Sequence, residues 1–524
     1  MIEWGINNGI EWNEKLKVYD FKDTGRGIIT NDEIKENEVL ISIPEKFLIH
    51  SKSKFSLDKL NPPNISNKIN TTNKKGLTTT IENNNPSPLS IFYKPFHDSV
   101  NQFNPKQRIS FHLIIEKLLK KNSIWFNYLN DLPNEYNITS TYDDKEIEYI
   151  GYPIYVEKVF KLKNEMISSF NSFKEILMKN YENDLNRIII KLNDNDNENE
   201  NDEDNDKIGN IKLNEIINFN LYEWCWGTIQ SRTYYYNRNM KQQQQQKLES
   251  DKDDCTLVPL ADLFNHSSFV DTEAIFNEKK QCYQVITKTR FEKDTQVFIS
   301  YGKHSNFTLM NYYGFIIENN TNDSIPLIQG DAIPNQLLLE KENDIKSYEK
   351  KLLILEQYGL SIYGDNSKFL ILIDKELPFS WNYLSVLKVL FMTKDELNNQ
   401  LELNLFHYDL PISKSNHEKV LNFLKNLSIS QLTHFKNYLN SYNNNNNNNN
   451  INNNNNFGGF NDINNNDNNG IGKRFEISYI LEFNIKMWEG CIEWVDLQCL
   501  SLKEEKEDIL IGANQKKNKK KKKK

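Results

Sequence analysis

Leu257-Val-Pro-Leu-Ala-Asp-Leu-Phe-Asn-His-Ser267 is an apolar run, typical of a strand, that leads into the polar pair Asn265 and His266. Further along the chain, Val297-Phe-Ile-Ser-Tyr-Gly302 is a second strand-like run that ends at Tyr301. An Asn-His pair at a strand end can hold two hydrogen-bond partners in a fixed orientation. Each stretch alone is more typical of an ordinary turn, so the argument rests on their order and on their surroundings.

Further segments surround these two stretches. Upstream of them lie Thr24-Gly-Arg-Gly-Ile28 with Ile41-Ser-Ile-Pro44, then Trp125-Phe-Asn-Tyr-Leu-Asn-Asp-Leu-Pro133, then Trp226-Gly-Thr-Ile-Gln-Ser-Arg232. The first of these is a turn between short apolar runs within the strand-like region 18–48, and the last ends a helix-like region. We expect 257–315 to form short strands and tight turns.

Taken together and in this order, these segments resemble the signature segments of SET-domain protein methyltransferases. They are most similar to the branch that contains the plant Rubisco large-subunit methyltransferase and the actin-histidine methyltransferase. The resemblance implies an α+β fold, in which a SET β-fold of short antiparallel sheets with a helical insert precedes an all-α substrate-binding domain. The sequence departs from the family at Lys293-Asp294, where glycine is usual, but aspartate tolerates the left-handed turn. It also lacks the C-x-C of the zinc-binding segment found in histone-directed relatives.

The chain divides by composition and periodicity. We expect a SET domain over 15–302, with a helical insert at about 91–240, and a helical substrate-binding domain over 326–500. In the latter, Ile345, Tyr348, Leu352 and Leu355 lie on one helix face that ends at Gly359, and Thr393 with Glu396 forms a capping box. Stretches rich in Asn, Gln or acidic residues have too little apolar surface to fold, so we expect disordered insertions there. These stretches are 61–90, 193–206, 241–253 and 443–470, followed by a lysine-rich tail at 501–524.

The composition excludes several classes of protein. The 524 residues have a net charge of −8, although the last nine residues hold eight lysines. The rest of the chain is therefore acidic, which disfavours a general nucleic-acid binder. Five cysteines without C-x-x-C spacing argue against a zinc site and a disulfide framework, and favour a reducing compartment. Without a signal peptide or an apolar run of membrane length, we expect a soluble monomer in the cytoplasm or nucleus, with no membrane partner.

The resemblance also implies a site and a cofactor. S-adenosyl-L-methionine would be bound by Gly27, Arg232, Asp262, Asn265, His266 and Tyr301, without a metal. By the same resemblance, Tyr301 would place its hydroxyl beside the transferred methyl group and act as the catalytic residue. Arg232 would pair with the cofactor carboxylate, and Gly27 would let the backbone approach the cofactor. The alternatives are a surface ion pair for Arg232, a hairpin glycine for Gly27 and a core tyrosine for Tyr301.

The expected reaction is methylation of a lysine in another protein, a non-histone protein rather than a histone. A free lysine has a pKa near 10.4, so an apolar channel that lowers this pKa would raise the reactive fraction. Two alternatives remain open, a protein-histidine methyltransferase and an idle scaffold that binds partners. The substrate channel is expected at Tyr234 and Ala261. By resemblance, the histidine-directed relative has a polar amide side chain and a tryptophan at these two positions. An aromatic face beside a small residue suits a long cationic side chain, which favours lysine.

Overall fold

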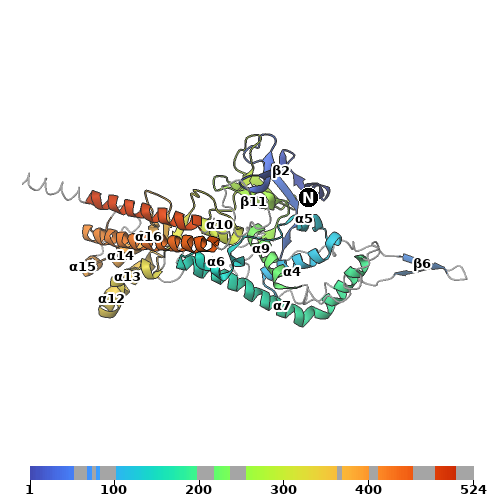
Figure 1. Ribbon diagram of the computed structural model, residues 1–524. Helices are drawn as coiled ribbons and strands as arrows, with labels where there is room; N and C mark the ends of the chain where they lie inside the picture. Colours follow the sequence, from blue (N-terminus) through green and yellow to red (C-terminus); the bar gives the residue numbers. More distant parts are fainter. Residues whose placement is uncertain are drawn as a thin grey trace, which may run out of the picture. The chain divides into compact units, whose positions relative to one another are not determined.

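The computed structural model describes residues 1–51, 68–72, 78–82, 102–196, 217–236, 255–327, 329–362, 369–399, 411–451 and 478–502. The chain forms two compact units (Figure 1). The first unit comprises Met1–Thr141, Lys161–Lys303 and Asn311–Gly314. The second comprises Tyr142–Phe160, His304–Met310 and Phe315–Lys524.

The first unit contains many short strands, as the sequence predicts. They are β1 (Glu11–Trp12), β2 (Leu16–Phe21), β3 (Gly25–Thr30), β4 (Val39–Pro44), β5 (Ile49–His50), β6 (Lys68–Thr72), β7 (Thr78–Glu82), β8 (Thr233–Tyr235), β9 (Cys255–Leu257), β10 (Asn265–His266), β11 (Thr272–Asn277), β12 (Cys282–Thr287) and β13 (Phe298–Ile299). One sheet has the order β1-β4-β12-β11, another has β5-β9-β8, and β2 pairs with β3. These pairs are antiparallel, whereas β10 and β13 are parallel.

The sequence explains the position of the central strands. β4 reads Val-Leu-Ile-Ser-Ile-Pro and is buried at four consecutive positions, the pattern of a strand covered on both faces. Its neighbour β12 is likewise buried at five of six positions. The polar residues between them are satisfied, because Gln284 Nε2 donates to Ser42 Oγ at 3.0 Å. The predicted hairpin at Asp23-Thr24-Gly25 joins β2 to β3, with Tyr19 opposite Gly27.

The helices of the first unit form a second core beside these strands. They are α1 (Ile2–Asn7), α4 (Pro105–Leu118), α5 (Phe126–Asp131), α9 (Phe219–Arg232) and the part of α7 (Pro153–Asp196) from Lys161 onward, with 3-10 turns at Glu45–Phe47, Lys120–Asn122, Thr139–Thr141 and Ala261–Leu263. α4 begins with a capping box, in which the side chains of Asn104 and Gln107 each accept a hydrogen bond from the backbone N–H of the other residue. Pro105 follows Asn104 as the first helical residue. Trp125 is fully buried in this core, and its indole N–H donates to the Phe47 carbonyl at 2.9 Å.

The segment 305–313 differs from the prediction, because the expected strands and turns are a helix, α10 (Asn306–Tyr313). Ser305 starts it, since its hydroxyl accepts the Thr308 N–H at 3.3 Å and its carbonyl accepts the Leu309 N–H. Gly314 follows the helix at φ +75°, and a Cβ there would lie 2.5 Å from the Asn137 carbonyl oxygen. The helix is short and directly follows a strand-like segment, so the sequence pattern predicted strands and turns there. Its sequence has no internal glycine or proline that would mark a turn.

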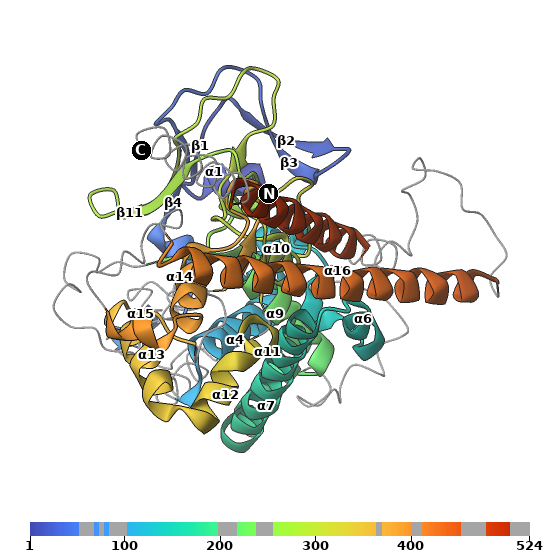
Figure 2. The same cartoon turned by 90° about the vertical axis from the view of Figure 1, so that its left-hand side faces the viewer.

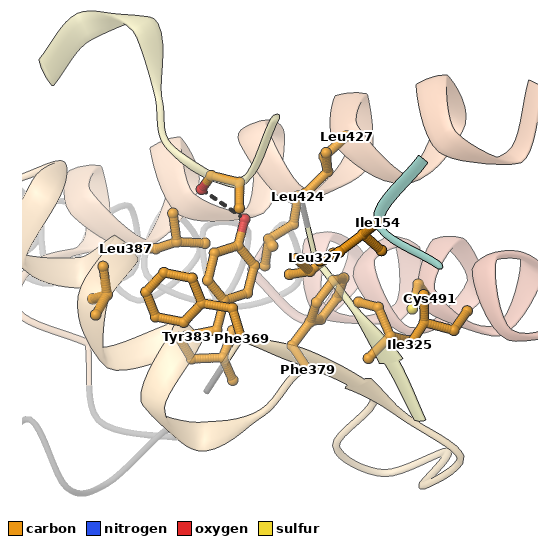
Figure 3. Packing of buried hydrophobic residues seen from close by; sticks show 14 of the residues in the cluster. Ile154, Ile325, Leu327, Phe369, Phe379, Tyr383, Leu387, Leu424, Leu427 and Cys491 are labelled. Atoms are coloured by element: carbon orange, nitrogen blue, oxygen red, sulfur yellow. Dashed lines mark hydrogen bonds between the residues drawn. The ribbon is translucent and has the colours of Figure 1, made fainter. Parts of the chain in front are cut away.

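The second unit is mainly helical, as predicted. Its elements are α6 (Asp144–Tyr149), the start of α7, α11 (Gln329–Ala332), α12 (Asn335–Asn343), α13 (Ile345–Gln357), α14 (Trp381–Leu390), α15 (Lys394–Asn398), α16 (Lys414–Ile451), a helix over 478–502, and the small sheet β14 (Ser324–Pro326) with β15 (Leu370–Leu372). The helix over 478–502 runs antiparallel beside α16 (Figure 2), with ion pairs Lys425–Asp496 and Lys436–Glu489. Figure 3 shows the apolar core, in which the Tyr383 hydroxyl donates to the Ala332 carbonyl at 2.9 Å.

Several local predictions for this unit can be compared with the structure. α13 ends before Gly359, which has φ +65°, and the Thr393–Glu396 capping box is present. Tyr348 and Leu355 are buried, but Ile345 at the first turn is 56% exposed, contrary to the expected face. Tyr142–Phe160 lies in the range expected for the SET insert, yet its side chains are part of the core of the second unit.

The predicted disordered insertions fall largely outside the described residues, and 241–253 does so entirely. The described parts of three of them have regular structure, which corrects the prediction there. β6 and β7 pair within 61–90, and α7 and α16 extend to Asp196 and Ile451. The threonine-rich strands have high β-propensity, and an established helix propagates cheaply into polar residues. No helix in the described part of the chain has the length and apolar character to cross a membrane.

Candidate active site

The turn between β9 and β10 is entered through an unusual backbone conformation. Leu260 has φ +71°, a left-handed value that costs a bulky residue on the order of 1–3 kcal/mol. Leu260 is fully buried, and a Cβ on Gly5 would lie 2.5 Å from its Cδ1. Packing therefore fixes Leu260 in place, and the 3-10 turn Ala261–Leu263 follows in one defined orientation.

Side chains of the predicted site hold this turn by its carbonyl groups. Three hydrogen bonds anchor it: the Tyr234 hydroxyl donates to Ala261 O at 2.7 Å, Arg232 Nη1 to Asp262 O at 3.0 Å, and the Tyr301 hydroxyl to Phe264 O at 2.7 Å. The donors come from the end of α9, from β8 and from the segment after β13. Because partly buried carbonyls need partners, these contacts tie two separate parts of the chain, 232–234 and the segment at Tyr301, to one turn.

A buried ion pair lies next to this turn. Arg232 Nη1 is 3.1 Å from Asp262 Oδ2, and the two side chains are 20% and 2% exposed. The Tyr128 hydroxyl donates to the same oxygen at 2.9 Å. Burial raises the pKa of Asp262, opposed by Arg232 and Tyr128. Burial would lower the pKa of Arg232, but the Asp262 carboxylate and the nearby Tyr136 and Tyr128 together raise that pKa, so the guanidinium stays charged.

An aromatic ring covers one side of the Arg232 guanidinium. Its Cζ is 6.0 Å from the centre of the Tyr136 ring, within the range of a cation–π contact. The Tyr136 hydroxyl in turn accepts from Thr228 Oγ1 at 3.0 Å. Gly227 provides the room for this ring, since a Cβ there would lie 2.5 Å from Tyr136 Cδ2. Close packing against the Tyr136 ring therefore explains why the W-G-T-I-Q-S-R segment has a glycine at position 227.

The Asn-His pair and Tyr301 are joined by strand pairing. β10 and β13 align Asn265 with Phe298 and His266 with Ile299. The Tyr301 N–H donates to His266 Nδ1 at 3.0 Å, and the two rings stack with centres 5.0 Å apart. The centre of the Tyr313 ring lies 5.0 Å from the centre of the Tyr301 ring. Burial raises the pKa of Tyr301, so its phenol is protonated at neutral pH and its proton is directed to Phe264 O.

The β2–β3 hairpin is fastened to the same site by Asn265. Its Nδ2 donates to the carbonyls of Thr24 and Arg26 at 3.3 and 3.2 Å. A Cβ on Gly27 would lie 2.6 Å from Asn265 Nδ2 and 2.6 Å from Gln296 Nε2. Gly27 therefore makes room for two side-chain amides. Gln296 also accepts from the Thr24 hydroxyl at 3.0 Å, while its Nε2 is buried without a hydrogen-bond partner.

All eight predicted residues lie in the first unit and are linked by one set of contacts. The sequence did not indicate Tyr128, Tyr136, Tyr313 or Gln296, which share these contacts. Tyr128 lies inside the quoted segment Trp125–Pro133, which was the available signal. In the described part of the chain, no group of three or more His, Cys, Asp or Glu side chains could hold a metal ion.

The chain is similar to proteins of one branch of methyltransferases. The family described as Rubisco LSMT substrate-binding matches residues 342–454. SET domain-containing protein 4 from Mus musculus is 23% identical over 74% of this chain and 73% of its own. Actin-histidine N-methyltransferase from Gallus gallus is 21% identical over 81% of this chain, which spans 59% of that relative's length.

Solved structures of Rubisco LSMT share the fold. One, the SET domain of LSMT bound to lysine and AdoHcy, has a TM-score of 0.56 at 16% identity, covering 96% of this chain and 91% of its own. Another, Rubisco LSMT bound to AdoMet, has a TM-score of 0.55 at 17% identity, covering 96% and 92%. The predicted α+β class and the resemblance to this SET-domain branch are confirmed.

Proposed function

We propose that this protein transfers a methyl group from S-adenosylmethionine to a lysine side chain of another protein. The observation that carries the proposal is the environment of Tyr301. Its hydroxyl proton is bonded to Phe264 O, its ring contacts the rings of His266 and Tyr313, and its phenol is neutral. A neutral phenol held in this way can accept a hydrogen bond from a substrate amine at one fixed position.

The residues present fit S-adenosylmethionine. Arg232 is a partly buried cation whose Nε has no hydrogen-bond partner, which suits a carboxylate. Asn265 holds the β2–β3 hairpin, so the backbone of Gly27, which carries no side chain, lies close to the Asn265 amide and can be approached by a cofactor. Solved relatives carry AdoMet or AdoHcy, which supports the same cofactor here.

The cofactor supplies a methyl group on a sulfonium, and transfer breaks the C–S bond while forming a C–N bond. The protein's part is alignment, because in-line displacement depends on near-attack geometry. Tyr301 is neutral and so does not act as the base. The amine loses its proton to solvent, and an apolar surrounding lowers the lysine pKa so that this loss becomes easier. Tyr301 then accepts a hydrogen bond from the neutral amine and orients its lone pair.

Lysine is favoured by the two channel positions. The Tyr234 hydroxyl is occupied by Ala261 O, so this side chain presents its ring rather than a free polar group. Ala261 is fully buried and small. A ring face beside a small residue suits a long, partly cationic stem. Histidine is the second candidate, and the similarity to actin-histidine methyltransferases is the observation in its favour.

The test is the single-turnover methylation rate of Tyr301→Phe. We expect a loss of at least about 100-fold, the scale for losing one positioned group, while the cofactor dissociation constant stays within a few-fold. Tyr283→Phe is the matched control, because this buried hydroxyl also donates to a carbonyl, that of Tyr235 at 2.9 Å. Equal rates in wild type and Tyr301→Phe would refute the assignment.

A further inference from the structure

The β2–β3 hairpin is anchored differently at its base and at its tip. At the base, the Val297 N–H donates to the Ile28 carbonyl at 2.8 Å. The Thr30 N–H donates to the Thr295 carbonyl at 3.1 Å, so backbone pairing joins β3 to the segment before β13. The tip, residues 22–26, is exposed to solvent. Its position relative to the rest of the first unit therefore depends on individual side-chain contacts.

Arg26 joins this tip to two other elements. Its carbonyl accepts from Asn265 Nδ2 at 3.2 Å. Its side chain reaches the end of α5, where Nη1 is 3.0 Å from Asp131 Oδ1 and Nη2 donates to the Asp131 carbonyl at 2.7 Å. Asp131 is the last residue of α5, so its carbonyl lies among those that the helix itself leaves unpaired. The negative end of the helix dipole also favours a cation at this place.

α5 gives the Arg26 side chain a fixed support. Tyr128, near the middle of this helix, is 1% exposed, and its hydroxyl donates to Asp262 Oδ2 at 2.9 Å. Three positions after Asp262 comes Asn265, which bonds the hairpin tip. The contact between Arg26 and the end of α5 thus completes a closed ring of contacts that runs through the hairpin tip, α5 and the turn before β10.

We propose that Arg26 is a positioning residue for the cofactor, because its side chain holds the hairpin tip in the place where the backbone at Gly27 can bind it. This inference rests on the proposed function, in which the cofactor approaches that backbone. Without the guanidinium, the tip leaves this place for part of the time, and the apparent affinity falls with the fraction of molecules that are competent to bind. The Arg26 and Asp131 side chains are 36% and 37% exposed, so we expect a modest effect that salt screens.

The test is a double-mutant cycle in which calorimetry measures binding of S-adenosylhomocysteine. We expect the affinity to fall about fivefold in Arg26→Ala and about threefold in Asp131→Ala, which keeps the carbonyl contact. The double variant should bind no more weakly than Arg26→Ala, because Asp131 acts through Arg26. Lys288→Ala is the matched control, since it removes an ion pair with Glu273 of similar exposure, 33% and 42%, and should leave the affinity unchanged.

Salt and temperature separate positioning from a merely structural role. The difference in affinity between wild type and Arg26→Ala should shrink between about 0.05 M and 0.5 M salt, where the screening length becomes shorter. Without ligand, the two melting temperatures should agree within about 2 °C, as for an ordinary surface substitution.

Wild-type affinity in Arg26→Ala, or losses that add in the double variant, would overturn the proposal. An affinity difference that is equal at both salt concentrations, or a lower melting temperature with unchanged affinity, would overturn it as well. Failure of the wild type to bind S-adenosylhomocysteine would instead contradict the proposed function itself.

Discussion

At the scale of single residues, Asn265 makes contacts that could not be read from the motif in which it lies. Its amide fastens the β2–β3 hairpin, whose carbonyls come from Thr24 and Arg26, about 240 positions earlier in the chain. Gly27 is bare because this amide and that of Gln296 need the space. The sequence marked Asn265 and Gly27 as site residues through resemblance. Their mutual packing could not be predicted, because no periodic pattern links positions so far apart.

Gly27→Ala tests this packing. A Cβ at 2.6 Å from both amide nitrogens must displace Asn265 or Gln296, so the hairpin should separate from β10. We expect the affinity for S-adenosylhomocysteine to fall at least about tenfold, with a loss of stability of about 1–3 kcal/mol typical of overpacking. Calorimetry and thermal denaturation measure the two effects.

Gly490→Ala is the matched control, because a Cβ there meets nothing within 4 Å. Alanine in an open helical position should stabilise slightly, by about 0.5–1 kcal/mol, and should leave ligand affinity unchanged. Wild-type affinity in Gly27→Ala would show that the hairpin does not depend on the two amides.

At the scale of elements, the sequence predicted secondary structure correctly where the pattern lay within a few neighbouring residues. The prediction failed where a short helix lies between strand-like segments. The Thr393–Glu396 capping box spans four residues and is present as predicted. The helix α10 was missed because it lies between strand signals and is only two turns long. A tertiary contact helps to start it: Asp323, 17 positions downstream, accepts the Asn306 N–H at 2.9 Å through Oδ1.

Asp323 makes the stability of this element depend on pH. Burial raises the pKa of its carboxyl to about 7, although the N–H groups of Asn306 and Ser324 oppose the rise. Its Oδ2 is buried without a hydrogen-bond partner. Between about pH 4 and pH 7 the native state therefore binds more protons here than the unfolded state. This group's contribution to stability falls as pH rises through that range and levels off above it.

Asp323→Asn should remove this dependence while keeping the oxygen that accepts the two N–H groups. We expect the variant to gain stability relative to wild type as pH rises from 5 to 8, by at most about 1.4 kcal/mol per pH unit. Denaturant unfolding across that range measures the difference.

Asp374→Asn is the control for this experiment. Asp374 is exposed and likewise accepts two backbone N–H groups, from Glu376 and Leu377. Because this side chain is exposed to solvent, its substitution should change the free energy of unfolding equally at each pH. A pH-independent difference between Asp323→Asn and wild type would contradict the account of Asp323.

At the scale of the whole molecule, the division into a strand-rich and a helical part follows from the sequence, because the period of the apolar residues changes from two toward 3.6. The substrate-binding match at 342–454 falls in the helical part. The membership of Tyr142–Phe160 in the second unit could not be predicted, since its buried residues Tyr152 and Tyr155 are packed against partners about 170 positions away. The domain limits 15–302 and 326–500 and the role of each site residue remain predictions.

The most direct test of the central claim identifies the residue type that this protein methylates. The protein is incubated with labelled S-adenosylmethionine and a cell extract whose own methyltransferases have been inactivated by heat, and the labelled peptides are sequenced by mass spectrometry. The same reaction with Tyr301→Phe defines the background. We expect label on lysine side chains of a small number of proteins, present with wild type and reduced at least about 100-fold with the variant. Label on histidine alone, or equal labelling by wild type and variant, would contradict the account.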